Sequence, residues 1–440
     1  MRALDRSRLV LGLVAAAALT AAGLNDSGPQ MFVKQALVPP AGAPDFAADR
    51  VVVKFEQDLT PLEIDATFGP LGARWLHTGV DHAFDVLRVE SGTVPEWVAY
   101  LSSMPGVTYA EPDYVCWASG VPNDPYYKPY QWNFFDYGEL SNGYASNYGV
   151  QGESTWNTTT GSGVIVAIVD TGVAYENFGA YYQAPDLAGA TFVSPYDFVN
   201  NDAHANDDNR HGTHVCGTVR QATNNGIGVA GLAHNCSIMP VKVLNSSGSG
   251  THSQIADGIR WAANNGAFAI NMSLSGPSGS TTLQSAVDYA WNAGCVLCAA
   301  SGNTSGNGVQ YPAKYTNCIA VGATRFDGKR CTYSTWGTGL DVVAPGGDTS
   351  RDQNHDGYGD GILQQTFSGA FNNWGYYFFE GTSMATPHVT AIAALVKSKK
   401  PTFTNSQVRS AIETTTTDLG TPGYDTKYGN GLVNALAATQ

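Results

Sequence analysis

The 440-residue sequence is poor in basic residues, with 23 Lys and Arg against 37 Asp and Glu, which gives a formal net charge of −14 at pH 7. Because non-specific binding to nucleic acids depends on clustered Lys and Arg, this composition argues against a nucleic-acid partner. Charged residues of both signs make up only 14% of the chain and hydrophobic residues 43%. This balance is typical of a globular protein with a large core, and it argues against a disordered chain.

Long hydrophobic runs are also missing. The N-terminus has three arginines, an apolar run from Leu9 to about Leu19, and small residues around Ala21 and Ala22. The run is shorter than the roughly 20 residues of a membrane span, so the pattern predicts a cleaved export signal over residues 1–22 and a linker over residues 23–49. We therefore expect a secreted, extracellular protein with no membrane association after cleavage.

Cysteine is scarce, and export makes the seven cysteines candidates for disulfides. Cys116 stands apart from an even six, whose pairing cannot be read from the sequence: Cys216, Cys236, Cys295, Cys298, Cys318 and Cys331. The CVLC stretch at 295–298 has the spacing of a zinc or redox pair. It lies in an apolar run without a His-rich partner, so buried strand cysteines are the favoured interpretation.

The chain has two regions with different hydrophobic patterns. Residues 51–115 alternate strand-like and helical segments and predict a small α+β unit of ferredoxin-like type, with a Gly- and Pro-rich boundary near residues 116–122. Beyond it, short apolar runs end in Gly, Ser, Thr, Asn or Asp, with helical patterns at 253–266 and 282–294. Such runs predict a doubly wound α/β fold with a mostly parallel sheet, and they cover residues 163–170, 237–244, 268–274, 296–303, 318–324 and 339–346.

Three polar residues at the ends of these elements have the chemistry of a catalytic triad. Asp170 ends a strand in IVDTGV, His211 opens a helix in RHGTHV, and Ser383 opens another in GTSMATPH, with Pro387 expected in its first turn. A hydroxyl nucleophile needs a base to accept its proton, and the base needs a carboxylate to orient it. The three residues can fill these roles.

The order Asp, His, Ser with these flanks resembles the subtilisin-like serine peptidases, the subtilase family. HGTHV and GTSMATPH together are highly specific. DTG alone is weak, because aspartic peptidases share it, but they would need a second DTG that this chain lacks. An α/β-hydrolase would need G-x-S-x-G, whereas Met384 and Ala385 follow Ser383. The resemblance implies an endopeptidase that acts on polypeptides, and it assigns the oxyanion-hole amide to Asn303.

The same resemblance implies two strand edges that pair with an extended substrate. One contains Ser249 and Gly250, and the other runs over Ser273, Leu274, Ser275 and Gly276. Gln310 falls where many relatives have a small residue at the base of the pocket for the residue before the scissile bond. A smaller, more polar pocket is therefore expected.

The small α+β unit resembles the inhibitory propeptide of this family. The expected organisation is a propeptide over residues 50–117, which acts as an intramolecular inhibitor in a zymogen, and a peptidase domain over residues 118–440. A permanent accessory domain is the less favoured alternative. We expect the mature enzyme to be a monomer.

The DQNHDGYGDGI stretch predicts a calcium loop. Oxygen ligands at alternate positions around a turn-forming glycine are typical of loops that wrap a hard divalent cation. The expected ligands are Asp352, Asn354, Asp356, the Tyr358 carbonyl and Asp360, with Gly357 at the turn. Leu363 replaces the bidentate Glu at the twelfth position, so we expect weak affinity.

The resemblance implies two further calcium sites. The first would be formed by Asp124, Asp186, Asn225 and the carbonyls of Ala222, Ile227 and Val229. A weaker second site would use Asp197, Asp202 and Asn206.

Two residues next to the predicted base receive specific interpretations. Arg210 stands where relatives usually have a small residue, and is expected either to shift the substrate preference on the leaving-group side or to depress the pKa of His211. His214 is predicted to be a structural, hydrogen-bonded histidine. The competing function class is a calcium-dependent binding protein without catalysis on the same scaffold, which the intact triad disfavours.

Overall fold

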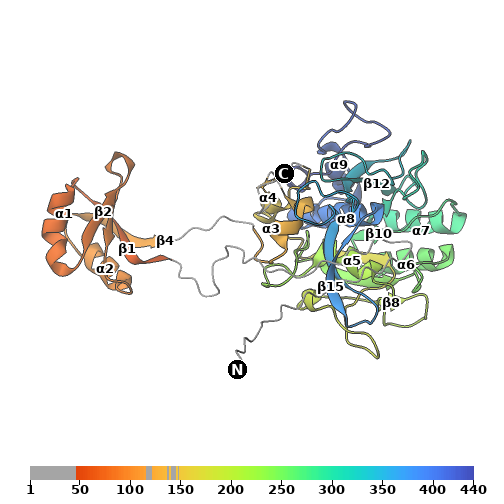
Figure 1. The fold of residues 1–440 in the computed structure, drawn as a ribbon, viewed down its shortest axis with the longest axis horizontal. Coiled ribbons are helices and arrows are strands. Elements are labelled where there is room, and N and C mark those ends of the chain that lie inside the picture. Colours follow the sequence, from red (N-terminus) through yellow and green to blue (C-terminus); the bar gives the residue numbers. More distant parts are fainter. Residues whose placement is uncertain (1–45, 115–120, 136–137, 140–144, 147) are drawn as a thin grey trace, which may run out of the picture. The chain divides into compact units, whose positions relative to one another are not determined.

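A computed structural model describes residues 46–114, 121–135, 138–139, 145–146 and 148–440 (Figure 1). The predicted export signal, most of the linker and Cys116 lie outside the described residues. The described part divides into two compact units, with the division between Val121 and Pro122. Within this part, no helix is long and apolar enough to cross a membrane.

The first unit is an antiparallel sheet with two helices, so the predicted α+β class is confirmed. The strand order is β2-β3-β1-β4, with β1 (Phe46–Phe55), β2 (Arg74–Thr78), β3 (Asp85–Arg88) and β4 (Val107–Tyr114). Helices α1 (Pro61–Phe68) and α2 (Val94–Ser102) contribute to its separate core. The sequence pattern missed β2, because this edge strand is only partly buried and its RWLHT segment has no clear apolar alternation.

The second unit is built on a seven-stranded sheet whose pairs are all parallel, so the predicted α/β class is confirmed. The sheet order is β13-β12-β11-β10-β7-β9-β8. Its strands are β7 (Ile165–Asp170), β8 (Tyr196–Asp197), β9 (Ser237–Lys242), β10 (Ala269–Met272), β11 (Val296–Ala300), β12 (Cys318–Thr324) and β13 (Val342–Pro345). All six predicted strands are present, and only the two-residue β8 was missed.

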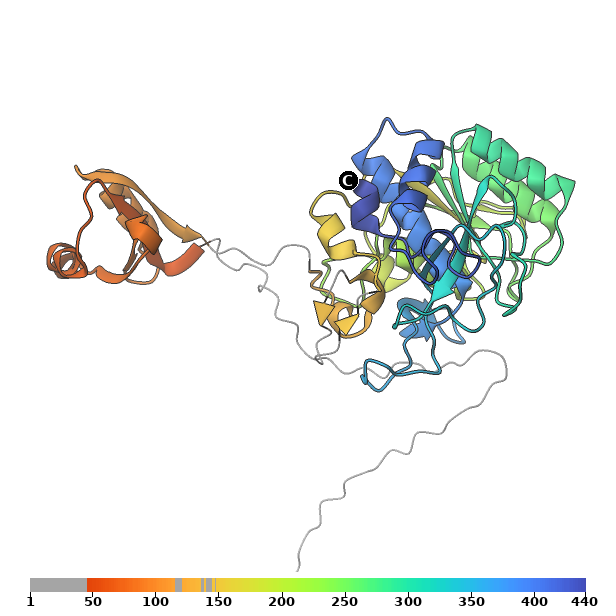
Figure 2. The ribbon, with the colours of Figure 1, turned by 90° about the horizontal axis from the view of Figure 1, so that it is seen from above.

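Both faces of this sheet are buried. Alternate residues of β7 enter two different cores: Val166 and Ile168 pack in the core that includes α5 (His211–Arg220) and α8 (Thr382–Lys399). Ala167 and Val169 pack in the core of α6 (His252–Asn264) and α7 (Thr281–Asn292). Figure 2 shows α6 and α7 together in green, away from the blue α8. Burial on both faces explains the apolar runs without alternation.

Smaller elements complete the second unit. A β-hairpin of β14 (Ile362–Phe367) and β15 (Trp374–Phe379) precedes α8, and β14 packs near α5. The remaining elements are α3 (Tyr127–Tyr130), β5 (Gly138–Glu139), β6 (Ala145–Ser146), α4 (Gly152–Trp156), α9 (Asn405–Thr414) and α10 (Ala435–Thr439).

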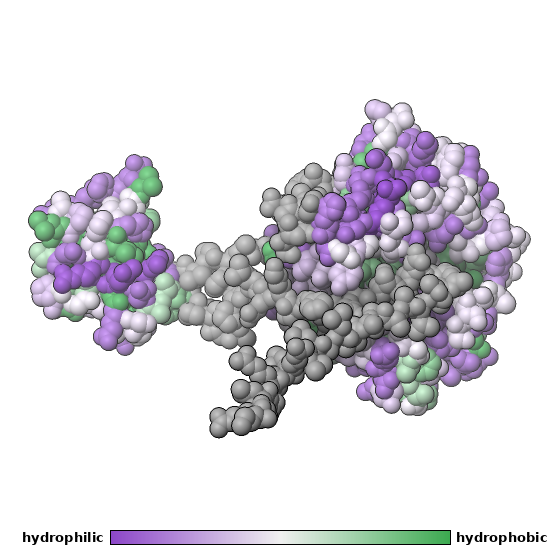
Figure 3. All heavy atoms as spheres, in the orientation of Figure 1, coloured by the Kyte–Doolittle hydropathy of each residue, from purple (hydrophilic) through white to green (hydrophobic). Residues whose placement is uncertain are grey.

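The six cysteines of this unit are all buried and unpaired, so their interpretation as disulfide candidates is wrong. They are distributed over both cores: Cys295 and Cys318 pack on the α6 and α7 side of the sheet, while Cys298 and the other three pack on the α8 side. The preferred interpretation of CVLC as buried strand cysteines is confirmed. Where Figure 3 shows the surface of the described residues, hydrophobic residues form small scattered patches.

Candidate active site

Two parallel strands and two helix N-termini bring the predicted catalytic residues together. Asp170 is the last residue of β7 and is fully buried, and His211 is the first residue of α5. The distance from Asp170 Oδ1 to His211 Nδ1 is 2.7 Å. Ser383 is the second residue of α8, and it lines the same cleft as His211. The carboxyl ends of parallel strands are where α/β folds bind ligands.

Charges around His211 favour its protonated form. Burial alone would lower the pKa of the imidazole, but the charge and hydrogen bond of Asp170 and the charge of Asp207 raise the pKa above its usual value of 6.5. The net shift is upward, so a depression of this pKa by Arg210 does not prevail over the two carboxylates. Arg210 lies near the ring of Phe379, with 5.6 Å between the guanidinium carbon and the ring centroid.

The neighbouring His214 is structural, as predicted. Its Nε2 lies 2.9 Å from the Tyr377 carbonyl, and its ring stacks on Phe379 with centroids 4.2 Å apart. Burial lowers the pKa of His214 to about 3, so the ring is neutral. Since both its ring face and Nε2 contact β15, His214 is not available as a second base.

The Ser383 segment contains a proline deeper in the helix than expected. Pro387 is the sixth residue of α8, not part of the first turn, and it removes the N–H that would bond to the Ser383 carbonyl. The Ser273 hydroxyl donates to that carbonyl instead, at 2.7 Å. The Ser383 hydroxyl in turn donates to the Ser273 carbonyl at 3.1 Å, and the described residues show no hydrogen bond between Ser383 and His211. Catalytic hydrogen bonds often form only when substrate is bound.

Asn303 follows β11 and lies beside the start of α8. Its Oδ1 accepts hydrogen bonds from the N–H and the hydroxyl of Thr382, at 3.0 and 2.8 Å. This fixes the amide, so that Nδ2 faces the space next to Gly381. A Cβ built on Gly381 would lie 3.5 Å from Asn303 Nδ2 and 3.6 Å from Ser383 N. Two N–H donors therefore border one small space that glycine leaves open.

The cleft that contains His211 and Ser383 has a volume of about 500 Å³. All predicted substrate-edge residues line it: Ser249, Gly250, Ser273, Leu274, Ser275 and Gly276. Gln310 does not line the cleft directly, whereas the next two residues, Tyr311 and Pro312, do. Gln310 still reaches this wall, because its Oε1 accepts a hydrogen bond from the Ser275 hydroxyl at 2.9 Å.

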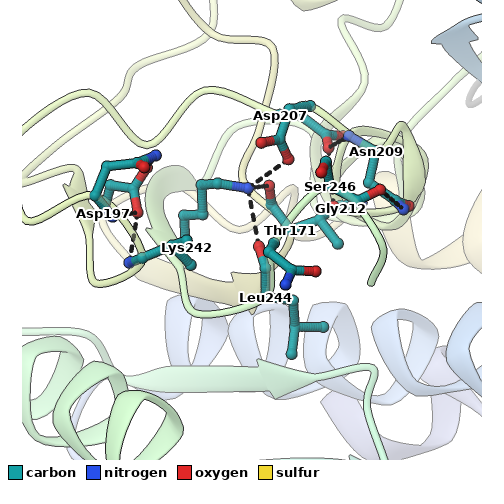
Figure 4. A network of polar contacts seen from close by, with 12 residues as sticks. Thr171, Asp197, Asp207, Asn209, Gly212, Lys242, Leu244 and Ser246 are labelled. Carbon is teal, nitrogen blue, oxygen red and sulfur yellow. Dashed lines mark hydrogen bonds and ion pairs between the residues drawn. The ribbon is translucent and has the colours of Figure 1, made fainter. Parts of the chain in front are cut away.

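A buried polar network behind the triad was missed at the sequence level (Figure 4). Lys242 is 1% exposed and pairs with Asp170 in the β7–β9 register. Its Nζ donates to the carbonyls of Thr171 and Leu244 and to Asp208, at 2.7, 2.8 and 2.6 Å. The network fixes the chain that follows Asp170. In the sequence, the one indication of this network is a lysine within the apolar run of β9.

The 352–360 loop has some features of a cation site. Asp360 is 2% exposed and its Oδ1 is buried without a hydrogen-bond partner. Burial and the neighbouring acidic charges raise the pKa of Asp360 to about 7, and burial raises that of Asp356 to about 6. Gly357 has a φ of +91°, as the predicted turn requires. The Asp352 and Asn354 side chains both accept a hydrogen bond from the Asp356 N–H, at 3.1 Å.

This loop is tied to the segment that carries Ser383. The backbone N–H of Thr349 and its hydroxyl both donate to Glu380 Oε2, at 2.6 and 2.7 Å. The backbones of Asp348 and Asp360 are paired, with a distance of 3.0 Å from Asp348 N to Asp360 O. The segment that contains the loop therefore contacts a residue only three positions before Ser383.

The first of the other predicted calcium sites is partly assembled. Asp124 and Asp186 are buried, and burial raises their pKa values to about 6 and 7, respectively. The Asn225 side-chain amide donates to Asp186 Oδ1 at 2.7 Å, and the Val229 N–H donates to Asp186 Oδ2 at 3.1 Å. The Ala222 N–H donates to the Asp186 carbonyl. Ile227 is also adjacent, because its N–H donates to Asn225 Oδ1.

For the second set, the described residues show no hydrogen bond between the side chains of its members. Asp197 accepts hydrogen bonds from Val199 and Asn200 in its own turn, and Asn206 donates to Glu176. Asp202 is joined to Asp197 only through backbone hydrogen bonds. In the described part of the chain, no group of three or more His, Cys, Asp or Glu side chains is arranged to hold a metal ion. A cation would need amide and carbonyl oxygens to complete its coordination.

Comparisons with known proteins agree with this geometry. A model described as "Subtilase family" matches residues 161–431, and one described as "Fervidolysin N-terminal prodomain" matches residues 34–113. A "Thermophilic serine proteinase" from Bacillus sp. (strain AK1) is 39% identical over 390 residues, which cover 87% of this chain and 86% of that protein.

Two further relatives support the same assignment. "Subtilisin Savinase" from Lederbergia lenta is 44% identical over 284 residues, or 64% of this chain and 92% of that protein. A solved protease structure from Pseudoalteromonas arctica PAMC 21717 has a TM-score of 0.62 and 35% identity, and covers 72% of this chain and 98% of that one. The chain belongs to the subtilase family. It is a subtilisin-like serine protease with an N-terminal prodomain.

Proposed function

We propose that this protein is a secreted endopeptidase that cuts peptide bonds through an acyl-enzyme formed on Ser383. The observation that carries the proposal is the 2.7 Å contact between the buried Asp170 and His211, which lines the same cleft as Ser383. This arrangement supports the assignment of Ser383, His211 and Asp170 as nucleophile, base and orienting carboxylate.

In the proposed reaction the Ser383 hydroxyl attacks the scissile carbonyl carbon and its proton passes to His211 Nε2. Asp170 accepts the hydrogen bond from His211 Nδ1, which fixes the tautomer and stabilises the imidazolium. His211 then gives the proton to the leaving amine. In the second half of the reaction, water attacks the acyl carbon and gives its proton to His211. His211 then returns the proton to the Ser383 oxygen as the ester bond breaks, and the acid product is released.

The negative charge that develops on the substrate oxygen would lie beside Gly381. Asn303 Nδ2 and the Ser383 N–H border that space, and the Asn303 amide is already oriented by Thr382. At the second position of α8, the Ser383 N–H has no partner within the helix. Donors that are oriented before the reaction stabilise the oxyanion without reorganisation.

Substrate would lie extended between the two edges of the cleft, at Ser249–Gly250 and Ser273–Gly276. Gln310 holds the Ser275 hydroxyl from behind this wall. A bulky side chain at Gln310 in place of a small one reduces the space behind Ser275. We therefore propose a preference for small or polar substrate residues before the scissile bond.

Calcium is proposed as a stabilising cofactor. The 352–360 loop would hold it through Asp352, Asn354, Asp356, Asp360 and the Tyr358 carbonyl, and a second ion would be held around Asp124, Asp186 and Asn225. The buried Asp360 Oδ1 without a partner supports the first site, because a buried carboxylate oxygen requires a proton or a cation. A bound calcium ion neutralises these carboxylates and supplies no step of the reaction.

The N-terminal unit is proposed to inhibit the enzyme until it is removed. Its core of ten buried residues is separate from the cores of the peptidase unit. The proposal predicts that chains lacking residues 50–117 refold poorly and recover when that segment is added in trans. Efficient refolding without the segment would contradict its role in folding.

Labelling with a fluorophosphonate tests the catalytic proposal. The mature protein should be labelled at Ser383, and the Ser383→Ala variant should remain unlabelled while it keeps the parent's circular dichroism spectrum. Absence of label on folded, prodomain-free protein would instead favour a calcium-dependent binding protein.

A further inference from the structure

Asp207 is a fully buried carboxylate near the triad for which the catalytic proposal has no role. It is 1% exposed and lies four residues before His211, in the turn that leads into α5. An isolated buried carboxylate is expensive, so its position requires compensating hydrogen bonds. Asp207 has five, and all come from two segments.

Both oxygens of Asp207 accept hydrogen bonds from the start of α5. Oδ1 accepts from the N–H groups of Asn209 and Arg210, both at 2.9 Å. Oδ2 accepts from the N–H and the hydroxyl of Thr213, at 2.8 and 2.7 Å. Asp207 therefore satisfies N–H groups that a helix start leaves without partners, and its negative charge lies at the positive end of the helix dipole.

The fifth hydrogen bond joins Asp207 to the strand that carries Asp170. The Thr171 hydroxyl donates to Asp207 Oδ1 at 2.9 Å and accepts from the Gly212 N–H, also at 2.9 Å. A Cβ on Gly212 would lie 2.1 Å from the Gly172 carbonyl oxygen, which shows how closely the helix approaches the strand. Asp207, Thr171 and Gly212 are labelled in Figure 4. The residues that follow Asp170 and precede His211 thus share one carboxylate.

The turn held by Asp207 is strained. Arg210 has a φ of +90°, a conformation that favours glycine, and its side chain lies against Phe379. Strained conformations persist only where the surroundings enforce them. The hydrogen bonds from Asn209 and Arg210 to Asp207 provide that constraint immediately before His211.

We propose that Asp207 is a positioning residue for the catalytic base: it fixes the first turn of α5 against the end of β7, and its charge favours the imidazolium that forms during the reaction. The proposal depends on His211 being the base. Asp207 touches neither substrate nor the reacting atoms, so it acts through His211.

The charged and titratable groups near His211 come from several elements. Asp170 lies on β7, Asp207 precedes α5, and His214 and Arg210 belong to α5 and its N-cap. Asp170 and Asp207 both raise the pKa of His211. Asp208, next in sequence, pairs with Lys242 instead. Asp208 is therefore a control for the position of the acidic limb and not for kcat, because with Lys242 it helps to fix the residues after Asp170.

The test compares Asp207→Asn with Asp208→Asn and Thr171→Val. Asp207→Asn removes the charge, and we expect kcat to fall roughly tenfold to a hundredfold with KM nearly unchanged. The acidic limb of the pH profile should move to lower pH. Thr171→Val keeps the charge of Asp207 but removes the hydroxyl that joins Asp207 to the Gly212 N–H. We therefore expect kcat to fall, while the acidic limb of the pH profile keeps its position. Asp208→Asn should leave the limb in place.

A second measurement separates this proposal from the catalytic one. In the inactive Ser383→Ala background, the His211 titration can be followed by NMR with and without Asp207→Asn, and it does not require that Ser383 be the nucleophile. A His211 pKa that does not fall when Asp207→Asn is introduced would overturn the electrostatic role. If Asp207→Asn does not fold, Thr171→Val decides the positioning role, because the parent's kcat in that variant would overturn it.

Discussion

The segment that holds His211 and the segment that holds Ser383 are stabilised in different ways. Buried charges hold the first: Asp207 caps the start of α5, and Lys242 with Asp208 fixes the residues after Asp170. In the second, neutral groups hold the turn at Gly381. The Tyr333 hydroxyl and the Gly346 carbonyl accept from the Gly381 N–H at 2.9 and 3.0 Å, and the Asn303 amide and the Ser273 hydroxyl also contact this turn.

The difference follows the charge that each segment would meet in the proposed reaction. His211 would become positive, so buried carboxylates behind it are favourable. The space beside Gly381 would receive a negative charge, and a buried carboxylate there would repel it. The nearest acidic side chain along this segment, Glu380, is exposed and bonded to Thr349. Each side of the cleft is thus matched to the charge it must accept.

The largest expected effect on kcat comes from the segment that holds Ser383, where neutral groups surround Gly381. Replacing Asn303 by leucine removes one of the two donors beside Gly381 and should reduce kcat by about 10²–10³, with little change in KM. The check is steady-state kinetics on a peptide substrate, with the thermal midpoint of the Ser383→Ala, Asn303→Leu protein as the control for folding. A kcat within threefold of the parent would remove Asn303 from the oxyanion site.

The charged side is tested by pH. Only neutral His211 can accept the Ser383 proton, so activity is lost as the pH drops through the His211 pKa, by about tenfold per pH unit below it. Because Asp170 and Asp207 raise that pKa, half of the limiting kcat/KM should be reached above pH 6.5. A profile from pH 5 to 9 checks this. A midpoint at or below 6.5 would contradict the balance of charges described here.

A double-mutant cycle tests how the nucleophile turn is held. Ser273→Ala leaves the Ser383 carbonyl without its donor, because Pro387 has no N–H, and should cost about 1–3 kcal/mol of unfolding free energy. With Pro387→Ala as background, the new N–H can bond to that carbonyl and the cost should shrink. The hydrogen bond from Asn271 to Ser273 is lost in both backgrounds and cancels. Equal costs in the two backgrounds would argue against this compensation.

The smallest effect expected is that of calcium. With calcium tenfold above its Kd, the folded state should gain about 1–2 kcal/mol. The parent and Asp356→Ala, both carrying Ser383→Ala, are melted with calcium and with EDTA, and Asp418→Ala serves as a control from an acidic turn elsewhere. Equal increases of the midpoint in all three proteins would mean that the 352–360 loop binds no calcium.

The same experiment has a defined pH dependence. Without metal, the pKa values of Asp356 and Asp360 are raised to about 6 and 7, above their usual 3.8. Raised carboxyl pKa values stabilise the folded state at low pH, and this contribution disappears as the pH rises through 6 to 7. Calcium replaces the protons, so its stabilising effect should grow between pH 5 and 8.

The sequence was sufficient to predict the sheet and to propose the candidate catalytic residues, because both rest on local patterns. The run IVAIVD gives β7 and places Asp170 at its end, and HGTHV and GTSMATPH are specific motifs. Asp207 could not be recognised, because in NDDNRHGTH it reads as one of several acids in a solvated turn. Its burial depends on Thr171, 36 residues earlier in the chain.

The contact that compensates for Pro387 was hidden for a similar reason. Ser273 and Ser383 are separated by 110 residues, and no local pattern connects them. The 352–360 loop was predicted from its sequence, yet the link from Thr349 to Glu380 beside it depends on how the hairpin folds back. Local periodicity therefore predicts elements, while the polar contacts between distant segments emerge only from the folded chain.

The six buried thiols offer a practical readout of the opening of this protein. Burial raises their pKa values, to about 12 for Cys236, Cys295, Cys298 and Cys331, so neither thiolate nor access is available in the native state. A thiol reagent will modify them only when the chain opens. Because they sit in both cores, mass spectrometry of pulse-labelled protein would show which face of the sheet opens first. The rate of thiol modification would therefore measure the opening that exposes one protease molecule to digestion by another.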